Sequence, residues 1–376
     1  MTSELVDQLL IRHDRNDPTL ADVKHLDLGI TDVGVGTGTS GASSSSPGRS
    51  KVGTKNHSTA LRTILPSLPK LQSLSLSGMA LGPRGTKTLL STLVINGSCP
   101  LLTELILSKC RIGFFGAKEI GSIGLPTNLE KLDLSQNELE TEGVWQIKGA
   151  LECLQSLKYL NLSRNSLNDD ALSELGRLIP TLDKIAEIDL SNNNIQDNGA
   201  SSLGTALSTP ECSLKILNIS NNEIGDDGAR YLVESIASNT KLTSLDISNN
   251  NIQDDGGGEF VDKLGDKNHT LVNLNLAGNQ ISESRMRILD MLLKHRKSSS
   301  SCATSKSKTD QIQEEKTNNI VSNSIVDRVV ERASQIQRTV TETMENNRIV
   351  NVDKELDDLI NQMDEILLKL RNHTIQ

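Results

Sequence analysis

The sequence predicts an α/β solenoid, in which short strand–loop–helix units stack side by side into a right-handed β-α superhelix with a horseshoe shape. The first observation is the pattern LxxLxLxxNxI, which recurs at intervals of 27 to 31 residues. The second is an amphipathic helical pattern inside each interval, and the third is a helical pattern in the segment after the last copy. The copies begin at Leu71, Leu102, Leu129, Leu157, Ile185, Leu214, Leu242 and Leu271.

Each copy contains one strand and one helix. In the copy "LKILNISNNEIGDDGARYLVESIASNT", Leu214, Leu217 and Ile219 have the spacing of a short strand. The residues that follow share one helical face: Ala229, Leu232, Val233 and Ile236. One unit cannot bury both apolar faces by itself, so the copies must stack, with a parallel sheet on the concave side and helices outside.

Two polar positions also recur. An asparagine stands where the chain leaves each later strand, and its amide can satisfy buried backbone groups of adjacent turns. These residues are Asn137, Asn165, Asn193, Asn222, Asn250 and Asn279, with Met79 and Cys110 at the same place in earlier copies. Residues placed to cap the N-termini of the following helices are Thr141, Asp169, Asp197, Asp226 and Asp254. Capping favours a structural role for these acids over calcium binding.

The chain divides into four segments. Residues 1–20 are expected to form an N-terminal capping helix, and residues 21–297 a solenoid of about nine repeats, with a weaker first copy at Val23. A flexible insertion is expected at 34–56, because its GxGxxG match is followed by serines and Pro-Gly instead of a helix. Residues 298–309 resemble a linker, and 310–376 a helical, coiled-coil-like tail.

The tail has an apolar seam with heptad spacing, which predicts a helix that contacts a partner. Its residues are Leu356, Leu359, Ile360, Met363, Ile366, Leu367 and Leu370. Two heptads are too few for a stable isolated coiled coil. A second protein, homodimerisation through the tail, docking on the solenoid and disorder all remain open.

Composition limits the partners. The formal net charge is -9 and aromatic residues make up 2% of the chain, which argues against nucleic acid and anionic membranes. The N-terminal residues lack the apolar run of a secretory signal, and no stretch is long enough to span a bilayer. Five cysteines without CxxC spacing suggest neither disulfides nor zinc. A cytoplasmic protein without cofactor or metal is expected, with nuclear or cytoskeletal locations left open.

The long period, the "LDLSxNxI" strand and the "DDGA" helix start resemble leucine-rich-repeat proteins of the ribonuclease-inhibitor-like subfamily, over about residues 20–297. This subfamily includes ribonuclease inhibitors, repeats of NOD-like receptors, Ran GTPase-activating proteins and tropomodulin-like proteins. The resemblance implies a horseshoe fold and a protein-binding role, whereas the partner varies among members.

A candidate binding site lies on the strands. The x residues of LxxLxLxx are expected on the concave face, where Tyr159 is the only aromatic residue and Arg164 lies at the edge of the same repeat. The candidate partner-binding residues are Tyr159, Arg164, Asn161, Asp133, Asp189, Glu187 and Asp246. The alternative is that the Asp and Asn residues are merely consensus solvent-facing residues.

The favoured function is therefore a protein–protein interaction module, an intracellular adaptor, regulator or scaffold without catalytic residues of its own. One alternative is a GTPase-activating protein of the Ran-activator type, with Arg164 or Asn161 supplied to the partner's active site. The tail lacks the long, nearly pure acidic segment expected of that type. A second alternative is an actin-cytoskeleton regulator of tropomodulin-like type.

Overall fold

The structure is a computed structural model that describes residues 2–29, 57–266, 268 and 270–302. The described residues divide into two compact units, one within 1–195 and 209–222 and the other within 196–208 and 223–376. The whole predicted insertion at 34–56 lies outside the described residues. The predicted tail at 310–376 also lies outside them, with its heptad residues from Leu356 to Leu370.

The first unit contains a parallel sheet whose strands follow one another in chain order. Its strands are β1 (His25–Asp27), β2 (Ser73–Ser75), β3 (Glu104–Ile106), β4 (Lys131–Asp133), β5 (Tyr159–Asn161), β6 (Glu187–Asp189) and β7 (Ile216–Asn218). Neighbouring strands pair residue for residue, so equivalent positions of successive repeats stand side by side. The middle residue of each strand is a buried Leu or Ile, and its two neighbours lie on the other face.

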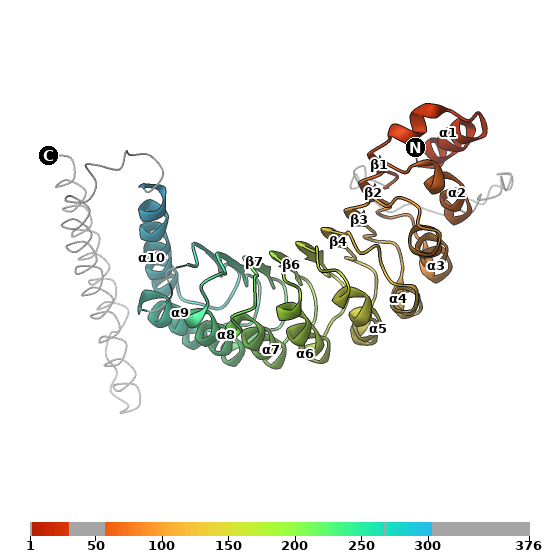
Figure 1. Cartoon of the computed structure of the whole chain (residues 1–376). Coiled ribbons are helices and arrows are strands. Elements are labelled where there is room, and N and C mark those ends of the chain that lie inside the picture. Colours follow the sequence, from red (N-terminus) through yellow and green to blue (C-terminus); the bar gives the residue numbers. More distant parts are fainter. Residues whose placement is uncertain (1, 30–56, 267, 269, 303–376) are drawn as a thin grey trace, which may run out of the picture. The chain divides into compact units, whose positions relative to one another are not determined.

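Within the described residues, helices cover one face of this sheet and leave the other open (Figure 1). They are α1 (Thr2–Asp14), α2 (His57–Ile64), α3 (Gly82–Leu90), α4 (Gly113–Ile123), α5 (Glu140–Glu152) and α6 (Asp169–Leu178). Short helical turns precede several strands: η1 (Pro18–Asp22), η2 (Leu65–Ser67), η3 (Ser91–Ile95) and η4 (Ile179–Thr181). The first helix, α1, packs on α2 and buries Val6 and Leu9.

The second unit repeats the same alternation. It comprises α7 (Asp197–Ser208), α8 (Asp226–Ser238), β8 (Ser244–Asp246), α9 (Asp254–Asp266), β9 (Asn273–Asn275) and α10 (Glu283–Cys302). Strands β8 and β9 pair in parallel, and α10 packs on α9 with Ile288, Leu289 and Leu293 buried. Helix α10 continues to Cys302, five residues into the segment predicted as a linker at 298–309. Among the described helices, none is both long and apolar enough to cross a membrane.

The predicted α/β solenoid is confirmed, since parallel strands alternate with helices in repeat order. The recurring asparagines have the predicted role. Asn165 is fully buried, and its Oδ1 accepts the backbone N–H groups of Asn137 at 2.9 Å and Leu139 at 3.4 Å. Its Nδ2 donates to the carbonyls of Leu134 and Leu162, both at 3.0 Å. Each such amide therefore connects its own repeat to the preceding one.

Cys110 occupies the asparagine position of an earlier repeat and makes part of the same connection. Its backbone N–H donates to Asn137 Oδ1 at 2.8 Å, and its thiol donates to the Leu76 carbonyl of the preceding repeat at 3.1 Å. Burial raises the pKa of this thiol to about 12. A weaker donor than the asparagine amide therefore continues the ladder at this position.

The helix-cap prediction was wrong for Asp197, Asp226 and Asp254, whose carboxylates accept N–H groups of the next repeat. Asp197 Oδ1 accepts the N–H groups of Gly225 at 2.7 Å and Gly228 at 3.0 Å, at the start of α8. Asp226 Oδ1 similarly accepts the N–H groups of Gln253 and Gly256 at the start of α9. Each carboxylate therefore satisfies free N–H groups of the next repeat's helix.

The same packing explains why a glycine follows the paired acids. A Cβ atom at Gly228 would lie 2.6 Å from Asp197 Oδ1, and one at Gly256 would lie 2.6 Å from Asp226 Oδ1. The glycines leave room for the carboxylate of the preceding repeat.

In the first unit the cap of α6 is Asn168, which accepts from the N–H groups of Asp170 and Ala171, instead of the predicted Asp169. The predicted cap Thr141 lies inside α5 and donates to Asn168 Oδ1 at 2.6 Å.

Candidate functional site

Five of the seven predicted site residues lie together on the open face of the first unit. Strand pairing aligns Lys131, Tyr159 and Glu187 in one row. It aligns Asp133, Asn161 and Asp189 in a second row, two residues further along the strands. We call the predicted residues of these rows the Tyr159 patch: Tyr159, Asn161, Asp133, Glu187 and Asp189.

Tyr159 is held from one side by a chain of polar contacts along its row. Lys131 Nζ lies 5.4 Å from the centre of the Tyr159 ring, a cation–π distance. The same ammonium group forms an ion pair with Glu104 Oε1 at 2.7 Å. Ser73 Oγ donates to Glu104 Oε2, also at 2.7 Å. The ring is therefore positioned across four consecutive strands, which reduces the side-chain entropy that a partner would have to remove.

The electrostatic surroundings of Tyr159 are acidic. Partial burial raises the pKa of the phenol to about 12, and the carboxylates of Asp133, Asp189 and Glu187 act in the same direction. A hydrogen bond with Asn161 has the opposite, smaller effect. The phenol therefore stays protonated throughout the neutral range and can donate a hydrogen bond.

We expect Tyr159 to ionise at a distinctly higher pH than free tyrosine. The chain has 2 tyrosines, so a Tyr231→Phe variant leaves Tyr159 as the only group that produces a tyrosinate absorbance change. Its ultraviolet titration should have a midpoint near pH 12 instead of about 10. Because the unfolded chain loses this proton first, the contribution of Tyr159 to stability is present below about pH 10. It is lost as the pH rises through the folded-state pKa.

The control is Asp189→Asn in the same background, which should lower the midpoint by removing one neighbouring negative charge. Circular dichroism at each pH is needed to verify that the chain is folded. A midpoint equal to that of free tyrosine, measured while the protein is folded, would contradict the described environment.

The acidic and amide residues of the second row also have a structural role. Asp133 Oδ1 accepts the N–H of Ser135 at 2.8 Å, and Asp189 Oδ1 accepts that of Ser191 at 2.9 Å. Asn161 Oδ1 does the same with Ser163 at 2.9 Å. These bonds stabilise the turn that ends each strand, since Asx side chains mimic a backbone turn. This turn bond is a structural reason for Asp and Asn to recur at this position. In Asp133 and Asp189, the carboxylate oxygen that does not accept the turn N–H is the one that could bind a partner.

Arg164 lies in a different place from the Tyr159 patch. It follows β5 and is exposed at the loops that leave the carboxyl ends of the strands. There it lines a groove of about 520 Å³, which we call the loop-edge groove. The lining residues are Gly78, Ala80, Lys109, Arg111, Gln136, Glu138 and Arg164. The sequence pattern placed Tyr159 and Arg164 in one patch, whereas the turn after the strand separates them.

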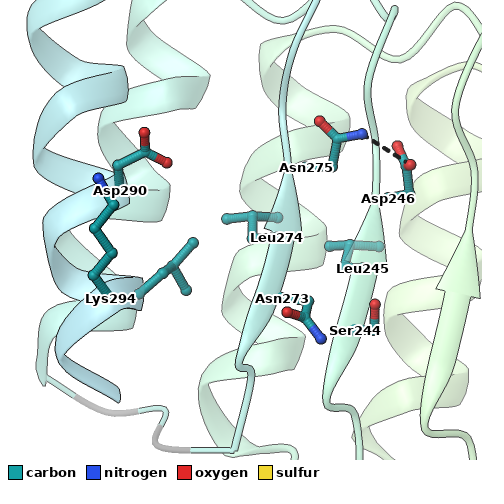
Figure 2. A pocket seen from close by; sticks show the side chains of 9 residues that line it. Ser244, Leu245, Asp246, Asn273, Leu274, Asn275, Asp290 and Lys294 are labelled. Carbon is teal, nitrogen blue, oxygen red and sulfur yellow. Dashed lines mark hydrogen bonds between the residues drawn. The ribbon is translucent and has the colours of Figure 1, made fainter. Parts of the chain in front are cut away.

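Asp246 belongs to the second unit and lines a cavity of about 240 Å³ bounded by β8, β9 and α10 (Figure 2). Asn275 Nδ2 donates to its Oδ2 at 2.9 Å, and Ser248 donates to its Oδ1 through both N–H and Oγ. Asp290 and Lys294 of α10 line the other side of this cavity. Both oxygens of Asp246 already have partners, which makes this residue a weaker candidate than Asp189.

Sequence reasoning overlooked Lys131 as a site residue. It lies at the position of Tyr159 in the preceding repeat, so aligning the repeats would have placed the two side by side. The side chain of Trp145 is 50% exposed on α5. Its neighbours Val144 and Ile147 are fully buried. The helical stripe therefore turns the valine and isoleucine inward and leaves the tryptophan outside.

Six segments of the chain match the model of the leucine-rich repeat family: residues 126–144, 153–176, 184–204, 212–233, 238–261 and 267–283. Strands β1 to β3 precede the first matched segment and continue the same pairing register. No curated protein matches the chain significantly in sequence. Among solved structures, leiomodin-1 actin-binding site 2 is similar at 16% identity and a TM-score of 0.36. The match covers 44% of this chain and 94% of that one, and a score this low supports no conclusion about function.

Proposed function

Since this chain is a leucine-rich-repeat protein, a class of protein-interaction module, we propose that it is an adaptor or regulator that binds a protein partner through the Tyr159 patch. The proposal rests on the position of Tyr159 on a strand of the open sheet face. All six aromatic residues of the chain lie in the described part, and Tyr159 is the only one on a strand. Tyrosine on an open sheet face is a residue type enriched at binding hot spots.

The charge around Tyr159 favours a partner with basic side chains. Asp133, Asp189 and Glu187 raise the pKa of Tyr159, so their negative field extends over the ring. Lys131 is the one cation in the two rows, and its ammonium group is already paired with Glu104. A partner's Lys or Arg placed over the ring would gain both cation–π and charge interactions.

We expect Tyr159→Ala to weaken binding of the partner by about thirtyfold, the loss of a hot spot of about 2 kcal/mol. The matched control is Tyr231→Ala, since Tyr231 is a second half-exposed tyrosine (48%) on the outer helix α8. Full-length protein and both variants would be used to capture proteins from a cell extract, and affinity for the captured partner would then be measured. Equal affinity of the Tyr159→Ala variant and the wild type would refute the proposal.

Charge reversal of the patch provides a second measurement. Asp189→Lys should reduce the affinity further for a basic partner, and the difference should shrink as salt is added. A partner that binds more tightly to this variant would contradict the expected basic chemistry. Activation of a GTPase and regulation of actin filaments stay predictions from the family resemblance.

A further inference from the structure

The loop-edge groove is a basic site in an acidic chain. Three of its lining residues, Lys109, Arg111 and Arg164, are cations, and Glu138 is its only acid. The whole chain carries a formal net charge of -9. The cations come from two repeats, since Lys109 and Arg111 follow β3 and Arg164 follows β5, so their positions along the groove depend on strand stacking, at about 4.8 Å per strand.

The two arginines are available to a ligand. Arg111, Glu138 and Arg164 are exposed, and within the described residues neither arginine forms an ion pair. Several other cations of the first unit are paired with carboxylates, as in Lys148–Glu174 and Lys158–Glu130, both at 2.7 Å. The groove therefore holds guanidinium groups that the fold itself does not neutralise.

The backbone at these positions supports a role outside folding. Lys109, Arg111 and Arg164 have φ values of 54°, 54° and 56°, in the left-handed region that long side chains rarely adopt. The repeat between them has Gln136 at the same position, with a φ of 57°. The remaining repeats with a positive φ there have glycine or asparagine, which tolerate this conformation: Gly78, Asn192, Asn221, Asn249 and Gly278. A long charged side chain here has a conformational cost that the turn does not require, and such outliers cluster at functional sites.

The backbone N–H groups of Lys109 and Arg164 form hydrogen bonds within the fold, which leaves their side chains as the ligand-binding elements. The N–H of Lys109 donates to the Ser135 carbonyl at 3.0 Å, and that of Arg164 donates to the Ser191 carbonyl at 3.0 Å. These bonds tie each turn to the next repeat and restrain the base of each side chain. Groups held in this way lose less freedom on binding than groups on a mobile loop.

We propose that the loop-edge groove binds an acidic stretch of peptide from a protein partner, with carboxylates pairing to Arg111 and Arg164. Guanidinium groups bind carboxylates in a bidentate manner. Arg111 follows β3 and Arg164 follows β5, two strand spacings of about 4.8 Å apart. An extended peptide advances about 3.3 Å per residue, so acidic side chains about three residues apart would reach both arginines. This site is separate from the Tyr159 patch, and the proposal does not depend on the function proposed for that patch.

The test is binding of a short, fluorescein-labelled oligoglutamate peptide to the full-length chain, followed by fluorescence anisotropy at low salt. The variant is Arg111→Ser with Arg164→Asn, which introduces residue types that other repeats of this chain use at these turns, as at Ser166 and Asn192. We expect about tenfold or more weaker binding, from about threefold or more for each lost charge-assisted bond. The difference should diminish as salt screens the charges.

The matched control is Arg62→Gln with Lys118→Gln, which removes the same charge from exposed positions of the helical layer, on α2 and α4. This control should bind the peptide like the wild type, and Tyr159→Ala should also bind it normally. Three results would overturn the proposal: no binding by the wild type, equal loss in the control, or equally tight binding of a single-stranded oligonucleotide. Circular dichroism of each variant distinguishes loss of binding from loss of fold.

Discussion

Asn165→Ala is expected to lower the free energy of unfolding of the first unit by about 3 to 5 kcal/mol, the largest effect of a single substitution that we predict. The side chain is fully buried and bonds backbone groups of two repeats, so alanine leaves several buried donors and acceptors without partners. Each such group costs about 1 to 3 kcal/mol. Because repeats are stabilised by their neighbours, the loss should extend to the adjoining repeats.

Denaturant titration followed by the fluorescence of Trp145, the single tryptophan of the chain and part of the same unit, measures this loss. The matched control is Asn194→Ala, because Asn194 is exposed and follows the next ladder asparagine by one residue. That substitution should change stability by less than about 0.5 kcal/mol. Equal effects of the two substitutions would contradict the role assigned to the buried amide.

Gly121→Ala is expected to destabilise the first unit by about 1 to 3 kcal/mol, as overpacking of a well-packed site does. A Cβ atom at Gly121 of α4 would overlap the backbone carbonyl of Gln146 on α5, and a backbone group cannot rotate away as a side chain can. The two helices would have to move apart. Helix propensity alone predicts the opposite sign, since alanine is favoured over glycine by about 1 kcal/mol in a helix interior.

The matched control for Gly121 is Gly149→Ala in α5. Apart from its chain neighbours and its own helix backbone, no described atom lies within 4 Å of a Cβ atom built at Gly149. Only helix propensity and the entropy of the unfolded chain therefore act there. This substitution should stabilise the protein by about 0.5 to 1 kcal/mol. Thermal or denaturant unfolding of the two variants should therefore give shifts of opposite sign. Stabilisation by both substitutions would mean that α4 and α5 are not in close contact at Gly121.

Five of the seven candidate site residues lie together in the structure, and the reason differs from residue to residue. Side chains of a strand alternate between faces, so the sequence was sufficient to place Tyr159, Asn161 and Asp189 on one face. Arg164 lies beyond the strand, where a left-handed turn sets the direction of the side chain. The strand period contains no information about that turn, and Arg164 is found with Arg111 in the loop-edge groove instead.

The sequence by itself determined the repeat, its strand and helix, and the buried asparagines, because these features recur at the same spacing in successive copies. Only the tertiary structure decided which groups meet across repeats. Asp197 satisfies the helix start of the next copy instead of its own, and Cys110 continues the ladder through its thiol. Such contacts join residues about one repeat apart, and their partners depend on how closely neighbouring copies stack, a distance that no single copy encodes.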